Sequence, residues 1–242
     1  MTKLFGATHV ATSDNSRGTW FSFVKAFTLA EVLITLGIIG VVAAMTIPML
    51  VENGMQKARI SMFKETASIL NQATTSILAE ESSFKGICET NNSNCIRDKF
   101  AQYIKTTKLC NGNNIYGECW VKKDEAMRLN GIKMWDFNSN HSAFVTNKGV
   151  FVDFIYADKN CNNNPWKVKK AGYCGMLMLD VNGFEKPNII GKDIYGFYIT
   201  PNGLLALGSK DTYTGDNNLD YLCGKGGDGE ACSYEYLYNI KK

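Results

Sequence analysis

Eight cysteines are the residues of this 242-residue chain whose chemistry depends most directly on their spacing. They stand at Cys88, Cys95, Cys110, Cys119, Cys161, Cys174, Cys223 and Cys232. No two of them are closer than seven positions, so the chain has no CxxC pair that could bind one zinc ion or exchange disulfides. An even cysteine count without such a motif predicts disulfides, and disulfides indicate an oxidising compartment.

The pairing with the shortest loops is the sequential one. It joins Cys88 with Cys95, Cys110 with Cys119, Cys161 with Cys174, and Cys223 with Cys232. By loop-closure entropy, each such bridge would contribute about 2–3 kcal/mol to stability. Many other pairings are formally open, and the alternative to full pairing is a set of partly free, buried cysteines, which suits an exported domain less well.

Motifs of catalytic sites are missing from the sequence. His141 is the only histidine beyond the first 26 residues, and the cysteines are better explained as paired, so a Cys–His nucleophile has little support. There is no GxSxG, no HExxH and no phosphate-binding glycine loop, and residues 224–229 (GKGGDG) are typical of a flexible loop. We therefore expect no enzymatic activity.

Two acidic loops carry the oxygen donors that Ca²⁺ prefers. The donors are Asp180, Asn182 and Asp193 in the first loop, and Asp216, Asn218 and Asp220 in the second. The second set has the one-three-five spacing of an EF-hand loop, but Tyr221 stands where that loop has its glycine. For both loops the alternative to a calcium site is an Asx-type turn between strands.

Charge gives no support for nucleic-acid binding. The chain has 26 Lys and Arg against 23 Asp and Glu, a net charge of +3, and no stretch gathers its cations along a surface for phosphates. A composition that is 45% apolar and 20% charged is that of a chain able to bury a core.

One segment is apolar enough to cross a membrane. Residues 32–51 (VLITLGIIGVVAAMTIPMLV) are twenty positions without a charge, and as a helix they would span roughly the 30 Å hydrocarbon core. The 26 residues before Phe27 carry three cations against one acid, which would hold that end in the cytoplasm. Glu31 lies in the first turn of this helix, where burial of a carboxylate in lipid is costly and calls for a partner.

Residues 25–31 (KAFTLAE) and the apolar run that follows resemble the processing site of type IV prepilins and type II secretion pseudopilins. The resemblance covers about residues 25–60. It implies that a prepilin peptidase cuts between Ala26 and Phe27 and methylates the new amine of Phe27. It also implies that Glu31 is the family's assembly glutamate, and that Gly40 and Pro48 lie where the family's helix loosens.

The partners that the resemblance implies are prepilin peptidase, other pilin or pseudopilin subunits, and the inner-membrane assembly platform. Cleavage would create a cationic amine four residues from the Glu31 carboxylate, and the amine of a staggered neighbouring subunit could pair with that carboxylate. The alternative is that Glu31 is only a helix N-terminal acid, favourable to the helix dipole. Major pseudopilins carry calcium in a late loop of the head, which by resemblance favours the second acidic loop.

Beyond Pro48 the pattern becomes amphipathic, with apolar residues at seven-residue spacing between charged ones. This predicts one helix over residues 28–81, its second half lying against a globular head. A coiled coil is the competing explanation, but the stripe lasts under four heptads and lacks regular leucines. The fold class we predict is α+β: a long N-terminal helix packed on an antiparallel sheet, with loops stapled by disulfides.

The head is expected to consist of short strands and polar loops. We predict a short helix at residues 96–105 and strands at 142–146, 150–156, 175–181, 194–200 and 203–207. Residues 147–149 (NKG) and 201–203 (PNG) have hairpin-turn chemistry, because their glycines supply positive φ. The predicted organisation is a leader (1–26), a transmembrane assembly helix (27–51), an amphipathic helix (52–82) and an extracytoplasmic head (83–242).

The expected function is that of a structural subunit of a type IV pilus or type II secretion pseudopilus. It would cross the inner membrane once, with its head outside the cytoplasm, and then enter the filament. One alternative is a minor or tip adhesin that uses loops bearing Trp166, Tyr173 and Tyr213 for a ligand. The other is an anchored extracellular domain that keeps residues 1–26.

Overall fold

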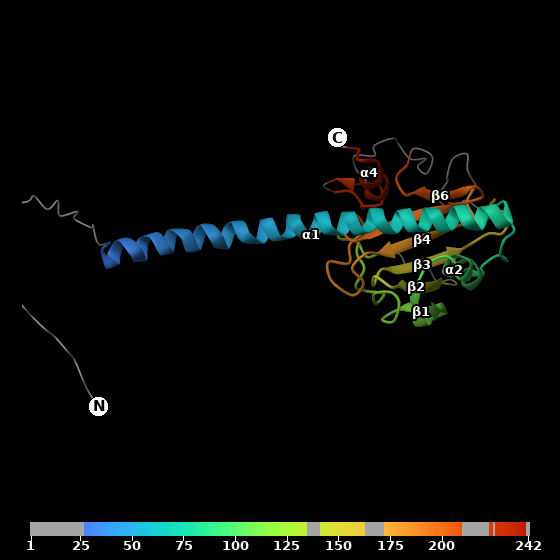
Figure 1. Cartoon of the computed structure of the whole chain (residues 1–242), viewed down its shortest axis with the longest axis horizontal. Helices are drawn as coiled ribbons and strands as arrows, with labels where there is room; N and C mark the ends of the chain where they lie inside the picture. Colours follow the sequence, from blue (N-terminus) through green and yellow to red (C-terminus); the bar gives the residue numbers. More distant parts are fainter. Residues whose placement is uncertain (1–26, 135–140, 163–171, 210–222, 225, 241–242) are drawn as a thin grey trace, which may run out of the picture. The chain divides into compact units, whose positions relative to one another are not determined.

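The computed structural model describes residues 27–134, 141–162, 172–209, 223–224 and 226–240 (Figure 1). The chain has an α+β fold in which a long N-terminal helix is followed by an antiparallel sheet and four disulfides. By their internal contacts the residues group into two compact units, Met1–Pro48 and Met49–Lys242. Each unit is described by itself below.

The long helix α1 covers Leu29–Glu81, as the sequence predicted to within one residue. It ends where Ser82 takes a left-handed backbone conformation with a φ of 63°, while the Ser82 N–H still donates to the Leu78 carbonyl at 2.9 Å. Gly86, with a φ of 80°, follows and completes the reversal of the chain.

The sheet is a six-stranded antiparallel meander whose spatial order is the sequence order. Its strands are β1 (Thr106–Asn111), β2 (His141–Thr146), β3 (Phe151–Tyr156), β4 (Gly175–Asp180), β5 (Ile194–Thr200) and β6 (Gly203–Ala206). The five predicted strands are confirmed, and each of their ends agrees with the prediction within one residue. The strand β1 was not predicted. Both predicted hairpin turns are present, with positive φ at Gly149 (80°) and Gly203 (144°).

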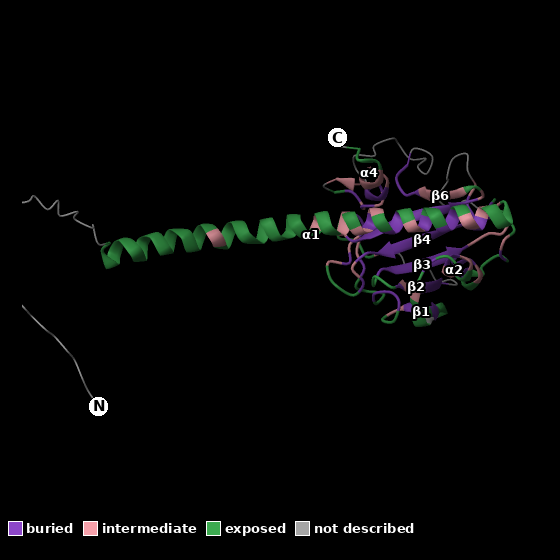
Figure 2. Ribbon diagram, in the orientation of Figure 1, coloured by how far each residue is buried: buried purple, intermediate pink, exposed green. Residues whose placement is uncertain are grey.

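Both faces of the sheet are covered, so every residue of β3, β4 and β5 is buried. On one face, the second half of α1 contributes a buried row that recurs every three or four residues: Phe63, Ala67, Leu70, Ala73 and Ile77. Figure 2 shows this row as the purple stretch of α1. Because the row packs on the chain's own sheet, it needs no partner helix, and the coiled-coil explanation for the seven-residue spacing becomes unnecessary.

Three short elements complete the fold. The helix α2 covers Ser93–Ala101, where Asn92 caps the first turn by accepting a hydrogen bond from the Cys95 N–H at 3.1 Å. It begins and ends earlier than predicted, which leaves room for β1. The 3₁₀ helix η1 (Gly112–Ile115) and the C-terminal helix α4 (Cys232–Tyr238) were not predicted.

Candidate functional site

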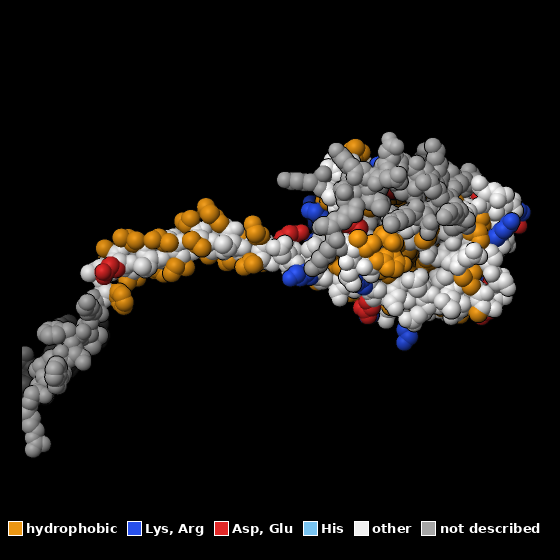
Figure 3. Space-filling model, turned by 90° about the horizontal axis from the view of Figure 1, so that it is seen from above, with side chains coloured by type: hydrophobic (Ala, Val, Ile, Leu, Met, Phe, Trp, Pro, Cys, Tyr) orange, Lys and Arg blue, Asp and Glu red, His pale blue; other side chains and the backbone are white. Residues whose placement is uncertain are grey.

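The first part of α1 is apolar and exposed. An 18-residue window within the helix has a mean hydropathy of 2.3 and no buried residue, so its length and composition suit a membrane span. Figure 2 shows this part of α1 almost entirely green, and Figure 3 shows apolar side chains along it. In soluble proteins such a long apolar surface normally marks a site of contact with a membrane or another protein.

Glu31 takes part in a capping box at the start of this segment. Its Oε2 accepts hydrogen bonds from the Thr28 N–H and the Thr28 hydroxyl, both at 2.9 Å, and its own N–H donates to Thr28 Oγ1 at 3.2 Å. We expected this carboxylate to pair with a neighbouring subunit, with a helix N-terminal acid as the alternative. The bonds to Thr28 agree with the alternative, and pairing between subunits stays a prediction. The T-x-x-E spacing of residues 28–31 is itself a capping-box signature. Both bonds that the carboxylate accepts end on Oε2.

The other predicted residues of this segment stand apart from the cap. Phe27 precedes the helix with 84% of its surface exposed, and Ala26 lies outside the described residues. The helix runs unbroken through Gly40 and Pro48, and a Cβ placed on Gly40 would have no neighbour within 4 Å. The loosening that the resemblance implies at these two positions concerns packed subunits and stays a prediction.

All eight cysteines are joined in the predicted sequential pairs, across separations of 7, 9, 13 and 9 residues. None of the eight is free. Four closed disulfides are consistent with the oxidising environment that we expect for the head.

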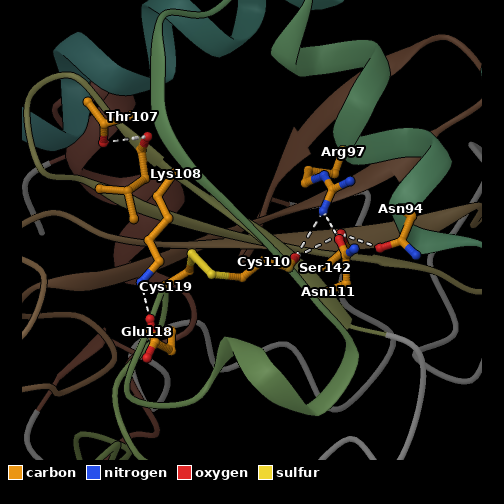
Figure 4. Close-up of a disulfide and its surroundings, with 10 residues drawn as sticks. Asn94, Arg97, Thr107, Lys108, Cys110, Asn111, Glu118, Cys119 and Ser142 are labelled. Carbon is orange, nitrogen blue, oxygen red and sulfur yellow. Dashed lines mark hydrogen bonds and ion pairs between the residues drawn. A yellow bond between two sulfur atoms is a disulfide. The ribbon is translucent and has the colours of Figure 1, made fainter.

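The Cys110–Cys119 disulfide is held to the sheet by hydrogen bonds at its Cys110 end (Figure 4). The carbonyl of Cys110 accepts hydrogen bonds from Nη1 of the buried Arg97 at 3.0 Å and from the Ser142 hydroxyl at 3.3 Å. Arg97 also binds the side chain of Asn111, and the Ser142 hydroxyl donates to Asn94 at 2.8 Å. These contacts join α2, β1 and β2, so the loop that the disulfide closes starts from a fixed strand end.

The first acidic loop lies between β4 and β5. Asp193 closes it, because its two carboxylate oxygens accept the N–H groups of Asn188 (2.8 Å) and Ile189 (2.6 Å). Asp180 accepts the Asn182 N–H at 3.2 Å, which is the Asx-type turn named as the alternative to a metal site. The structure thus brings the three predicted donors of this loop into one closed turn, with Asp180 and Asp193 fully buried.

The remaining predicted site residues lie either outside the described residues or in the protein interior. Asp216, Asn218 and Asp220 of the second acidic loop, and the aromatic residues Trp166 and Tyr213, lie outside the described residues. Tyr173 is only 3% exposed and packs edge-on against Tyr198 with ring centroids 5.6 Å apart, so it does not present the exposed ring that the adhesin alternative would use. A tyrosine in a polar loop looks exposed in sequence, and only the fold reveals that it belongs to a buried apolar cluster with Met176, Met178 and Tyr198 of the sheet.

Two pairs of titratable residues were not predicted, one buried in the sheet and one half-buried near the C-terminus. His141 Nδ1 lies 2.8 Å from Asp153 Oδ2, joining β2 to β3 inside the protein, where burial raises the pKa of Asp153. Near the C-terminus, burial and the neighbouring Asp228 carboxylate raise the pKa of Glu230 to about 8. No sequence signal could have found these pairs, since each depends on which side chains the fold removes from water.

Comparison of the chain with protein-family models, with curated proteins and with solved structures finds no match. The function therefore has to be argued from the residues and their geometry.

Proposed function

We propose that this chain is a structural subunit of a type IV pilus or a type II secretion pseudopilus, processed between Ala26 and Phe27. The observation that carries the proposal is the first part of α1, an exposed apolar helix with a single carboxylate, Glu31, in its first turn. The resemblance of residues 25–31 to a prepilin processing site and the four disulfides of the head support the same proposal.

In this role the apolar part of α1 is covered first by lipid and then by neighbouring subunits. Before assembly, lipid covers its side chains, since a helix satisfies its own backbone hydrogen bonds. In a filament, the same side chains pack against the equivalent helices of neighbouring subunits. Removing this much apolar surface from water is favourable in both states, by about 25 cal/mol per Å², so the exchange between membrane and filament costs little.

The capping box gives Glu31 a defined role in that exchange. Thr28 occupies Oε2 and holds the carboxylate at the helix start, while Oε1 accepts no hydrogen bond in the described part of the chain. A carboxylate can accept several hydrogen bonds, so Oε1 stays available for a cation. In the proposed filament that cation is the methylated amine of Phe27 on a neighbouring subunit, and pairing them removes two uncompensated charges from an apolar environment.

Processing is tested by intact mass and N-terminal sequencing of the protein taken from membranes of its own host, with free thiols alkylated beforehand. We expect a chain that starts at N-methylated Phe27 and carries four intact disulfides. A chain that starts at Met1 would contradict the proposal and support an ordinary anchored domain.

Two variants of Glu31 separate its charge from its capping role. Glutamine keeps the capping box but loses the charge, whereas alanine loses both. We expect Glu31→Gln and Glu31→Ala to be cleaved normally and to reduce the yield of sheared filaments at least tenfold, while Glu65→Gln, a charge loss on the exposed side of the same helix, leaves the yield unchanged. Normal filaments from Glu31→Gln would show that the cap, and not charge pairing, is what assembly needs.

A further inference from the structure

The loop between β4 and β5 contains an unusual group of buried oxygen atoms. Oδ2 of Asp180, Oδ1 of Asn182 and Oδ1 of Asn188 are all buried and have no hydrogen-bond partner among the described residues. The side chains of Asp180 and Asn188 are 0% and 3% exposed, so bulk water does not reach these oxygens. Buried acceptors without a donor cost free energy, and they call for a ligand that supplies positive charge.

The charges around the loop point the same way. Asp180 lies close enough to Asp193 for their carboxylates to repel each other. The amide nitrogen of Asn182 donates to the carbonyls of Glu185 at 2.9 Å and Lys186 at 3.2 Å, which leaves its Oδ1 as an acceptor. Arg59 of α1 is the cation that interacts with Asp193, but its guanidinium also binds Glu52 at 3.2 Å and the Lys186 carbonyl at 3.4 Å. Two buried carboxylates therefore share, at most, one partly engaged cation.

We propose that this loop binds one hard divalent cation, calcium, through Oδ2 of Asp180 and the amide oxygens of Asn182 and Asn188. Calcium takes six to eight oxygen ligands and accepts carboxylate, amide, main-chain and water oxygens in flexible geometry. Asp193 balances part of the ion's charge without binding it, because its own oxygens hold the N–H groups of Asn188 and Ile189. The choice of calcium over another hard cation rests on the proposed function, which places the head outside the cytoplasm. The set of ligand atoms does not depend on the proposed function.

The site is expected to be weak and reachable. No cluster of three or more His, Cys, Asp or Glu side chains occurs among the described residues. Main-chain carbonyls of the loop and water that enters with the ion must therefore complete the ligand set, and we expect a Kd of about 10⁻⁴–10⁻³ M, as in extracellular calcium modules. Asn182 also lines a cavity of about 240 Å³ between the loop and α1, which gives an ion a way in.

Occupancy would fix the loop where it holds α1. Gln56 donates to the Lys192 carbonyl at 3.1 Å, and Arg59 donates to the Lys186 carbonyl. Both bonds join α1 side chains to main-chain carbonyls of this same loop. A cation that orders residues 180–193 therefore also orders the contact that the loop makes with the helix.

The test is calcium binding by the purified full-length chain in detergent micelles, stripped with EDTA at pH 7.5. Isothermal titration with CaCl₂ should give one site, with MgCl₂ much weaker, and calcium at ten times the Kd should raise the melting temperature by roughly 3–6 °C. Asp180→Asn should abolish both responses. Glu89→Gln, a charge loss at an exposed position outside this loop, should keep them.

Each other outcome is informative. If the wild type shows no heat and no shift, and Asp180→Asn is as stable, a proton on Asp180 fills the site and the proposal is wrong. If Asp180→Asn still binds, the ion sits elsewhere, and the assignment to this loop is also wrong. Should that variant not fold, Asn182→Ala decides, with an expected tenfold loss of affinity. None of these readouts depends on processing or filament assembly, so the proposed function fails or stands separately.

Discussion

Phe63 is a buried side chain through which α1 packs on the sheet, and Phe63→Ala tests that packing. The Phe63 ring is 0% exposed and stacks on Tyr195 with ring centroids 4.1 Å apart and a 19° interplanar angle. Truncating a buried phenylalanine to alanine costs about 3–5 kcal/mol, and an aromatic pair contributes about 0.5–1.5 kcal/mol beyond its buried area. We therefore expect a loss of about 4–6 kcal/mol in the free energy of unfolding.

The matched control lies two positions along the helix. Glu65 forms an ion pair with Lys148, and about half of its side chain is exposed, at 49% against 42% for the lysine. Solvent screening reduces such a pair to about 0–1 kcal/mol, so Glu65→Ala should change stability far less than Phe63→Ala. Phe63→Leu, which keeps much of the apolar volume, should fall between the two.

The assay is urea unfolding of the full-length chain in detergent micelles, followed by the fluorescence of its tryptophans, one of which, Trp120, is buried. Stability is taken from the midpoint and slope of each curve. If Phe63→Ala cost less than about 1 kcal/mol, or Glu65→Ala cost as much as Phe63→Ala, apolar packing would not be what holds this part of α1 to the head.

Two further predictions concern the head. Burial raises the pKa of Glu230 from 4.5 to about 8, so the folded state binds this proton more tightly than the unfolded state, and its contribution to stability falls as pH rises from about 4.5 to about 8. Glu230→Gln should therefore flatten the pH dependence of the urea midpoint in that window, and an unchanged slope would argue against a half-buried, protonated Glu230. Replacing Cys161 and Cys174 by serine opens a loop with a sequence separation of 13 and should cost about 3 kcal/mol, measured again by urea unfolding; a loss below about 1 kcal/mol would mean that this bridge is not needed to hold its loop.

Local patterns predicted most of the fold. The limits of α1, five of the six strands and both glycine turns follow from periodicity and turn chemistry that act within a few residues. The sequential disulfides follow from loop length. The strand β1 was missed because its residues (TTKLCN) alternate poorly and only Cys110 is buried, so the partner strand β2, and not the segment itself, decides its conformation.

The candidate sites were harder to predict, because chemistry there depends on burial. The sequence of residues 180–193 predicted a loop with acidic oxygen donors. Only the fold shows that Asp180 is buried and interacts with a second carboxylate, that of Asp193. Tyr173 was placed on the surface for the same reason. The capping box at Thr28 and Glu31, by contrast, was readable from spacing alone, since the four-residue motif contains all of its partners.

The head can be assembled in the order in which it is synthesised. Among the described residues, each strand pairs only with the strands before and after it in sequence, and each disulfide closes between consecutive cysteines. The chain emerges N-terminus first from a ribosome or a translocation channel. Each new strand therefore meets the strand it pairs with as soon as it emerges. Each disulfide can form before the next pair of cysteines emerges. Such a chain has little need of an isomerase to undo wrong pairings, and it exposes few unpaired strand edges while the rest of the polypeptide is still inside.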